Sequence, residues 1–247
     1  MEISVIIPAY NEEKLIESCL KSITRQEYPR KNYEVIVVDG NSTDKTVSIA
    51  KKHADKVITQ KFRKGPGLAR NKGVKESKGR LLVFLDADTT VQKNFLKEVM
   101  KNEKGVIGGM PIIKTKSESK LIRTYHDIIT NKVNQLVNKL KLKRLVVPCT
   151  ACCFYKKKVF EEVSGFREFT WDDVDLWYRA KKKGKFTLLK NTKAVTSDRK
   201  YLILFKKLGK IRTLLFYIFV PIYETIRFNK NKKESKYMKR INYFKRE

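Results

Sequence analysis

Apolar and polar positions change their spacing several times along the first hundred residues of the 247-residue chain. Short apolar runs of strand length alternate with stretches whose apolar residues recur every three or four positions, the spacing of a helix. Strands separated by such helices are typical of a parallel sheet with crossover helices. The pattern predicts an α/β fold with a Rossmann-like, mostly parallel sheet flanked by helices. The predicted strands are residues 3–7, 34–38, 56–60 and 80–85.

Polar residues mark where the intervening helices are expected to begin. Asn11 is the predicted N-cap of a helix that runs to about Gln26, and Ser42 or Thr43 is the predicted N-cap of the next one. The elements predicted further along are a helix over 66–77, a strand over 106–113, a helix over 117–141, a strand and a short helix within 148–166, a helix over 171–183 and a short strand over 193–195.

Three of the predicted strands end in polar clusters, at residues 8–12, 39–42 and 86–88. The carboxyl ends of parallel strands meet at one edge, which is where open α/β sheets bind ligands. Asp86 and Asp88 stand two residues apart, so one carboxylate can hold a sugar hydroxyl while the other meets a hard divalent cation that bridges phosphates. A solvated turn would also contain aspartates, but three such strand ends favour a nucleotide-type ligand.

The chain is strongly basic, with a net charge of +30, and the excess lies in its second part. Residues 1–100 carry +6, residues 101–200 carry +14 and residues 201–247 carry +10. Such a surface attracts nucleic acid, an anionic membrane or a phosphorylated substrate. A lysine-rich solvated surface, as in proteins of heat-loving organisms, is the simplest alternative, and it explains only part of the charge because glutamate is not enriched in step.

Residues 201–247 form a separate basic and amphipathic tail, in which an apolar stretch at 214–223 is flanked by basic residues. This composition is typical of a segment that lies on a membrane surface, although a C-terminal helix that closes the core is the alternative. No apolar run reaches the 18–20 residues of a membrane span, and the N-terminus lacks the pattern of a signal peptide.

The cysteines do not have the spacing of a zinc site, since no fourth cysteine or histidine lies at the required distance along the chain. We expect small buried thiols of a reducing compartment instead. They are Cys19, Cys149, Cys152 and Cys153.

Five motifs in order resemble the inverting, family-2 glycosyltransferases of the GT-A fold, over about residues 3–200. They are residues 5–12 (VIIPAYNE), 37–44 (VVDGNSTD), 67–73 (GLARNKG), 85–88 (LDAD) and 171–176 (WDDVDL). Two positions depart from the family, because Gly40 stands where a second aspartate is more common and Asp172 stands where glutamate is usual. The resemblance implies a donor half over 1–104 and an acceptor half over 105–200.

The resemblance also implies a set of nucleotide-sugar-binding residues in the first half. Asp39 would accept hydrogen bonds from the base, Arg70 would hold base or phosphate, and Asp86 would contact ribose or sugar. Asp88 would bind the Mg²⁺ or Mn²⁺ that bridges the diphosphate and neutralises the leaving group. The implied set is Pro8, Ala9, Tyr10, Glu12, Asp39, Arg70, Asp86, Ala87 and Asp88.

In the second half the resemblance implies that Asp173 is the base that takes the proton of an acceptor hydroxyl. Trp171 and Asp172 would contact the acceptor, although a carboxylate in a first helical turn also simply stabilises the helix, the interpretation favoured for Asp172 and Asp175. Some relatives complete the metal site with a histidine after the last strand. None occurs here, so either Arg199 contacts the diphosphate or the metal has one protein ligand fewer.

These inferences predict an inverting hexosyltransferase that uses a UDP- or GDP-sugar and Mg²⁺ or Mn²⁺. The expected acceptor is a lipid-linked glycan or another membrane-bound compound, at the cytoplasmic face of the cell membrane. If the acceptor is a polyprenyl or dolichyl phosphate, no dedicated base is needed because the nucleophile is already anionic. A nucleic-acid-binding protein is the alternative from another class, and the carboxylates at the strand ends disfavour it because they repel phosphate without a metal.

Overall fold

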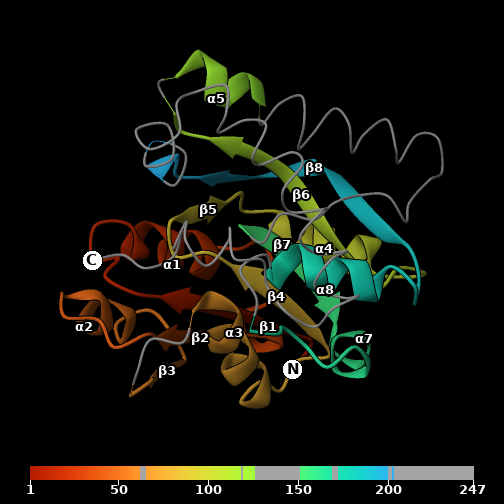
Figure 1. The fold of residues 1–247 in the computed structure, drawn as a ribbon, viewed down its shortest axis with the longest axis horizontal. Helices are drawn as coiled ribbons and strands as arrows, with labels where there is room; N and C mark the ends of the chain where they lie inside the picture. The colour runs from red at the N-terminus through yellow and green to blue at the C-terminus, as the bar shows by residue number, and fades with distance from the viewer. Residues whose placement is uncertain (62–64, 118, 126–150, 169–171, 200–201, 203–247) are drawn as a thin grey trace, which may run out of the picture.

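The computed structural model describes residues 1–61, 65–117, 119–125, 151–168, 172–199 and 202. One eight-stranded sheet forms the centre, with the strand order β3-β2-β1-β4-β7-β6-β8-β5 (Figure 1). Its strands are β1 (Ile3–Ala9), β2 (Tyr33–Asp39), β3 (Lys56–Thr59), β4 (Leu81–Leu85), β5 (Thr89–Val91), β6 (Gly108–Thr115), β7 (Cys152–Lys156) and β8 (Phe186–Thr196).

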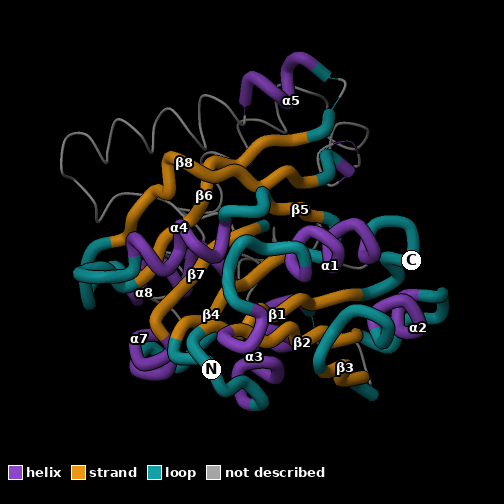
Figure 2. Tube along the Cα trace, turned by 180° about the vertical axis from the view of Figure 1, so that it is seen from behind, coloured by secondary structure: helices purple, strands orange, loops and turns teal. Residues whose placement is uncertain are grey.

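Helices cover both faces of the sheet, which appears as one continuous layer of strands when it is seen from behind in Figure 2. The helices are α1 (Ile16–Thr24), α2 (Thr46–Ala50), α3 (Pro66–Lys75), α4 (Phe95–Asn102), α5 (Lys120–Tyr125), α7 (Lys157–Glu162) and α8 (Asp172–Ala180), with one 3-10 turn, η1 (Arg30–Asn32).

The sheet is parallel in its first half and mixed in its second. β1 pairs in parallel with β2 and β4, and β2 pairs in parallel with β3, so the carboxyl ends of these four strands share one edge. β7 is antiparallel to both β4 and β6, β6 is parallel to β8, and β5 is antiparallel to β8. Four of the seven pairings are therefore parallel, and the mostly parallel sheet of the sequence prediction becomes a mixed one beyond β4.

Alternate side chains of the central strands enter two separate cores. Ile3, Val5 and Ile7 pack on one face together with α1 and α4, whereas Ile6 packs on the other face with α3, α7 and α8. A strand that is covered on both faces has to be apolar at nearly every position, because each side chain enters one core or the other. This explains the apolar run 81–85 and the run 3–7, which only Ser4 interrupts.

The structure corrects the two predicted helix caps. α1 begins at Ile16 and α2 at Thr46, and neither has a side-chain cap. Asn11 instead has a positive φ of 50° and accepts a hydrogen bond from the Thr43 amide, while Ser42 accepts one from the Asn11 amide. These side chains join two loops across space, a use of asparagine and serine that has the same local sequence pattern as a helix cap.

The sequence analysis did not predict β5, α4 or the turn η1, and β8 is longer than the predicted 193–195. The helix predicted over 117–141 is described only as α5, and its remainder lies outside the described residues. The tail 203–247 also lies outside them. Cys19, Cys152 and Cys153 are buried and free, as predicted, and no helix of the described part is long and apolar enough to cross a bilayer.

Candidate functional site

The loops after β1 and β2 form one hydrogen-bonded unit at the carboxyl edge of the sheet. Asp39 is fully buried at the end of β2, and its Oδ2 accepts the amide N–H groups of Asn41 (3.0 Å) and Ser42 (3.1 Å). The Ser42 hydroxyl donates to Asp39 Oδ1 at 2.5 Å. Asp39 thus holds the β2 loop in shape, and its contact with a base remains a prediction from the resemblance.

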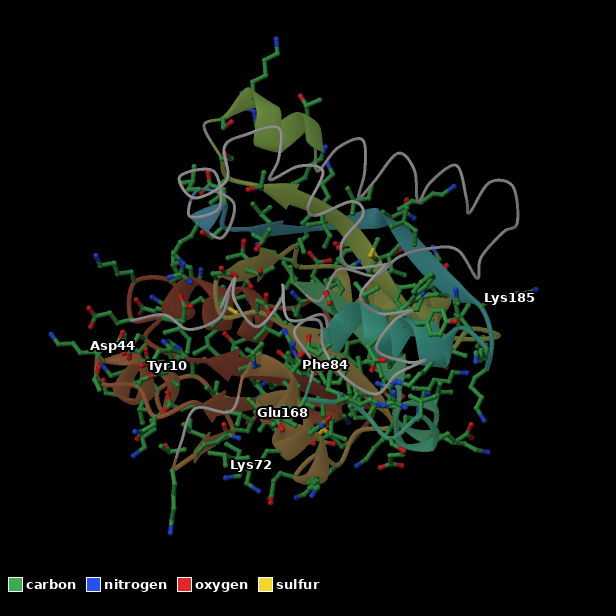
Figure 3. The ribbon with its side chains drawn as sticks, viewed as in Figure 1. Tyr10, Asp44, Lys72, Phe84, Glu168 and Lys185 are labelled. Carbon is green, nitrogen blue, oxygen red and sulfur yellow. The ribbon has the colours of Figure 1, made fainter. Side chains whose placement is uncertain are left out.

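Residues 12 and 13 tie the β1 loop to the start of α2. The Glu12 amide donates to the Thr46 hydroxyl at 2.8 Å, and the Glu13 amide donates to Asp44 Oδ2 at 3.1 Å. Figure 3 shows the labelled Tyr10 and Asp44 at the same end of the molecule, with Lys185 at the opposite edge. Of the predicted pocket residues, Pro8 and Ala9 therefore end β1, and Tyr10 and Glu12 lie on the following loop, which is anchored by its neighbour.

Asp86, directly after β4, is held by a buried arginine from α3. Arg70 is 2% exposed, and its Nη2 donates to Asp86 Oδ1 at 2.6 Å, while its Nη1 lies 3.8 Å from Asp172 Oδ2 at the start of α8. The sequence analysis placed Arg70 against base or phosphate. The structure places it beneath the edge, between two of the predicted site carboxylates.

The charges of this cluster influence one another strongly. Although burial alone would lower the pKa of Arg70, the carboxylates of Asp86 and Asp172 outweigh it and raise that pKa. Burial, with the negative charges of Asp173 and Asp86 and against the attraction of Arg70, raises the pKa of Asp172 to about 7. One cation is shared by two carboxylates in a dry environment, so the second carboxylate is hard to ionise.

Asp88 lies where β5 and β8 meet the donor edge. Thr89 on β5 pairs with Thr196 on β8, and both hydroxyls approach Asp88 Oδ1, at 3.3 and 3.5 Å respectively. Arg199, just after β8, donates to Glu12 Oε1 at 2.6 Å and has its Nη2 3.8 Å from Asp88 Oδ2. Burial alone would lower the pKa of Arg199, but the carboxylates of Glu12 and Asp88 raise it. The guanidinium therefore bridges the β1 loop and the Asp88 turn.

Among the described residues, no three histidine, cysteine or carboxylate side chains form a group that could hold a metal ion by themselves. Mg²⁺ is commonly bound through one or two carboxylates together with substrate phosphates and water. Asp88 supplies one such carboxylate, oriented by two hydroxyls and nearly buried. The residues present therefore fit a cation that is held jointly by Asp88 and a diphosphate.

The other two carboxylates of α8, Asp173 and Asp175, have different surroundings. Asp175 is fully buried and accepts two hydrogen bonds from Arg179, at 2.9 and 2.6 Å, and Arg179 also donates to the carbonyl oxygens of Val163 and Gly165. Asp175 is therefore structural, as predicted. Asp173 is half-buried, and its Oδ1 accepts the Val174 amide at 2.9 Å. Trp171 lies outside the described residues.

Sequence reasoning missed a clamp between α3 and the loop before α8. The Asn71 side chain donates to the Phe166 carbonyl at 2.7 Å and accepts the Phe166 amide at 2.9 Å. Thr196, which reaches Asp88, was also missed. Asn71 stands inside the GLARNKG motif, but nothing in the local pattern shows which distant backbone it holds.

The carboxyl edge thus brings together Asp39 at the end of β2, Asp86 with Arg70 of α3, and Asp88 with Arg199 after β8. One aspartate at the end of β2, together with two aspartates that lie next to arginines, suits the binding of a nucleoside diphosphate. The sequence profile of glycosyl transferase family 2 matches residues 4–164. This segment contains all of these residues except Arg199, and α8 also lies beyond it. The chain belongs to glycosyl transferase family 2.

Relatives in the family match only part of their own length. AglE of Haloferax volcanii, a glycosyltransferase, is 29% identical over 173 residues, which cover 66% of this chain and 55% of AglE. TarS of Staphylococcus aureus, a poly(ribitol-phosphate) beta-N-acetylglucosaminyltransferase, is 39% identical over 103 residues, or 40% of this chain and 18% of TarS. The chain therefore spans about half or less of the length of these relatives.

Solved structures share the fold. TarS residues 1–349 in complex with UDP-GlcNAc superimpose with a TM-score of 0.65 at 22% identity, covering 80% of this chain and 58% of that one. The mannosyltransferase PcManGT from Pyrobaculum calidifontis, in complex with GDP-Man and Mn²⁺, gives 0.61 at 22%, covering 78% and 56%. At such identities the likeness shows the fold alone, and it confirms the GT-A-like fold of this family-2 member.

Proposed function

We propose that this chain transfers a hexose from a nucleotide-diphospho-sugar to a lipid-linked or polymeric glycan acceptor, with inversion at the transferred carbon. The observation that carries the proposal is the convergence of Asp39, Asp86 and Asp88 at one edge of the parallel strands, in a member of a glycosyltransferase family. Two solved structures of the same fold contain nucleotide-sugars of this class, UDP-GlcNAc in TarS and GDP-Man in PcManGT.

The proposed chemistry is a single displacement. The acceptor oxygen attacks the anomeric carbon, the bond from that carbon to the diphosphate breaks, and the diphosphate leaves with the electron pair. Asp173 takes the proton of the acceptor hydroxyl, because it stands in the first turn of α8 beside the Arg70 cluster. Asp88 would hold Mg²⁺ or Mn²⁺, which would supply positive charge to the leaving diphosphate. Arg199 adds a second positive charge at the same place.

A second candidate acceptor is a polyprenyl or dolichyl phosphate. It is favoured by the basic charge of residues 101–247 and requires no base, since a phosphate oxygen is already a nucleophile. The two acceptors make different demands on Asp173, and replacing that residue separates them.

We propose that the protein works at an anionic membrane, peripherally and on the cytoplasmic face. Each lysine or arginine near an anionic surface contributes about 1 kcal/mol to binding, and the chain carries +24 beyond residue 100. Co-sedimentation with vesicles that contain anionic lipid, and none with neutral vesicles, is the expected result. Equal binding to both, or to neither, would refute the membrane part of the proposal.

Transfer activity is the direct test. The protein is incubated with UDP-GlcNAc, UDP-glucose, UDP-GalNAc or GDP-mannose, Mn²⁺ or Mg²⁺, and a membrane fraction or polyprenyl-linked acceptor, and the released nucleoside diphosphate is measured. We expect release from donors of one base, dependent on acceptor and on metal. No release from any donor, with a folded protein, would contradict the proposed function.

A further inference from the structure

A buried arginine stands between the donor side and the acceptor side of the site. Arg70 belongs to α3, Asp86 follows β4, and Asp172 is the first residue of α8. The guanidinium is hydrogen-bonded to Asp86 at 2.6 Å and lies 3.8 Å from Asp172, and it is also stacked over the Phe166 ring at 5.3 Å. Three segments that are distant in the sequence therefore meet at one side chain.

The packing around Arg70 leaves little freedom to the start of α8. A methyl group added at Gly67 would collide with the Asp172 carboxylate and would lie 3.1 Å from the Phe166 Cβ. The two hydrogen bonds between Asn71 and Phe166 hold the preceding loop against α3. α3 therefore supports both the donor carboxylate and the first turn of the helix that carries Asp173.

Arg70 is also unusual in what it leaves unused. Its Nε and Nη1 are buried and have no hydrogen-bond acceptor in the part of the chain that the structure describes. Buried N–H groups without acceptors are costly, and arginine offers five of them in a rigid fork. The free Nη1 is the nitrogen that faces Asp172, just beyond hydrogen-bond distance.

We propose that Arg70 is a positioning residue that couples donor binding to placement of the acceptor base. One nitrogen of its guanidinium fixes Asp86. A second nitrogen holds Asp172, which places the first turn of α8 and hence Asp173. The inference rests on the proposed function and deepens it. It assigns Asp172 a role in placing its neighbour rather than in contacting the acceptor. It also gives Gly67 a role, because only a residue without a side chain leaves room for the Asp172 carboxylate beside α3.

The test is a double-mutant cycle with Arg70→Lys and Asp172→Asn. Lysine keeps the charge but cannot bridge two carboxylates with a planar fork. The measurements are the dissociation constants of UDP and GDP with Mn²⁺, and kcat for nucleoside diphosphate release. Asp172→Asn should lower kcat about tenfold or more and change diphosphate affinity less than about threefold. Arg70→Lys should lower both, because Asp86 is released as well.

The two effects on kcat should not multiply. The double variant is expected to have about the kcat of Arg70→Lys alone, because both substitutions break the same connection. Independent, multiplicative effects would overturn the inference. A wild-type protein that binds neither diphosphate would overturn the proposed function, and this inference with it, whereas multiplicative effects in an active enzyme would overturn the inference alone.

α8 also provides a matched control and a second variant. Arg179→Lys alters another buried arginine–aspartate pair, to Asp175, and should lower the melting temperature while kcat and diphosphate affinity, measured where the variant is folded, stay unchanged. If Arg70→Lys likewise lowers only the melting temperature, Arg70 is only structural and the inference is wrong. Gly67→Ala displaces Asp172 while Arg70 and Asp86 stay in place, so it should lower kcat and leave diphosphate binding unchanged. An unchanged kcat in this folded variant would equally contradict the inference.

Discussion

The two edges of the parallel half of the sheet both contain buried polar groups, but they use them differently. At the amino edge, Glu34 Oε1 accepts the Ser4 hydroxyl and the Lys78 amide, both at 2.6 Å, and the Ser4 hydroxyl accepts the Gly79 amide at 2.8 Å. Lys157 completes this edge by donating to the Ser77 carbonyl at 2.8 Å. Protein groups bind one another there and form a closed network.

The carboxyl edge is not closed in this way. Buried atoms without a hydrogen-bond partner among the described residues include Nε and Nη1 of Arg70, Nε of Arg199 and Oε1 of Gln60, which follows β3. A cavity of about 600 Å³ opens at the amino edge, and four of its lining charges form ion pairs, Arg30 with Asp55 and Lys56 with Glu76. The comparison teaches that a hollow alone does not mark a ligand site, and the unsatisfied buried polar atoms favour the carboxyl edge as the place of a charged ligand.

The largest effect is expected at the carboxyl edge, from Asp88→Asn. The substitution keeps the shape of the side chain and removes the charge that would meet the metal, so kcat should fall by on the order of a thousandfold. The measurement is nucleoside diphosphate release at saturating donor and Mn²⁺. An activity within tenfold of wild type would show that Asp88 does not hold the metal.

Asp173→Asn, at the same edge, should act on transfer and leave donor binding intact. A hydroxyl acceptor needs its proton removed, so kcat should fall by about 10²–10⁴-fold, with an unchanged dissociation constant for the diphosphate. Rate and binding are measured on the same preparation. Near-normal turnover would indicate a phosphate acceptor in place of a hydroxyl one.

At the amino edge, Glu34→Gln should reduce stability and leave kcat unchanged. Glutamine retains an acceptor oxygen but weakens two charge-assisted hydrogen bonds, which should lower the free energy of unfolding by about 1–3 kcal/mol. Urea denaturation gives the stability, and diphosphate release gives kcat at a temperature where the variant is folded. A loss of activity without a loss of stability would contradict the assignment of function to the carboxyl edge.

The remaining prediction is a dependence of stability on pH at Asp172. Its pKa is raised from 3.8 to about 7 by burial and by the charges of Asp173 and Asp86, against Arg70. A carboxyl with a higher pKa in the folded state stabilises the fold below its unfolded pKa and loses this contribution as pH rises through the folded value.

Asp172→Asn has no such dependence. Its free energy of unfolding relative to wild type should therefore rise between about pH 4 and about pH 7 and level off above that range. Denaturation at a series of pH values measures this difference. A difference in the free energy of unfolding that is constant with pH would mean that the pKa of the Asp172 carboxyl is not raised by its surroundings.

The parts of the fold that could be predicted are those that follow from local periodicity. β1, β2, β3 and β4 were predicted within about two residues, because short runs rich in apolar residues mark strands, and their shared edge followed from their parallel pairing. β5 could not be predicted, because three residues carry no periodicity and its pairing with β8 joins distant segments.

The same distinction applies to the site. The carboxylates Asp39, Asp86 and Asp88 stand at strand ends and could be found from the sequence. The burial of Arg70 could not, because an arginine on a helix of mixed polarity has the pattern of a surface residue. Its partner Asp172 comes from a distant helix, and local sequence contains no information on such contacts. The cap residues Asn11 and Ser42 were misassigned for the same reason.

The central claim is that the carboxyl edge binds a nucleoside diphosphate through Asp88 and a divalent cation. The most direct test is the thermal stabilisation of wild type, Asp88→Asn and Glu34→Gln by UDP and by GDP, each with and without Mn²⁺. One diphosphate at 100 times its dissociation constant should stabilise wild type and Glu34→Gln by about 2.7 kcal/mol, only with Mn²⁺, and should not stabilise Asp88→Asn. Stabilisation by neither diphosphate, or equal stabilisation of Asp88→Asn, would contradict the claim.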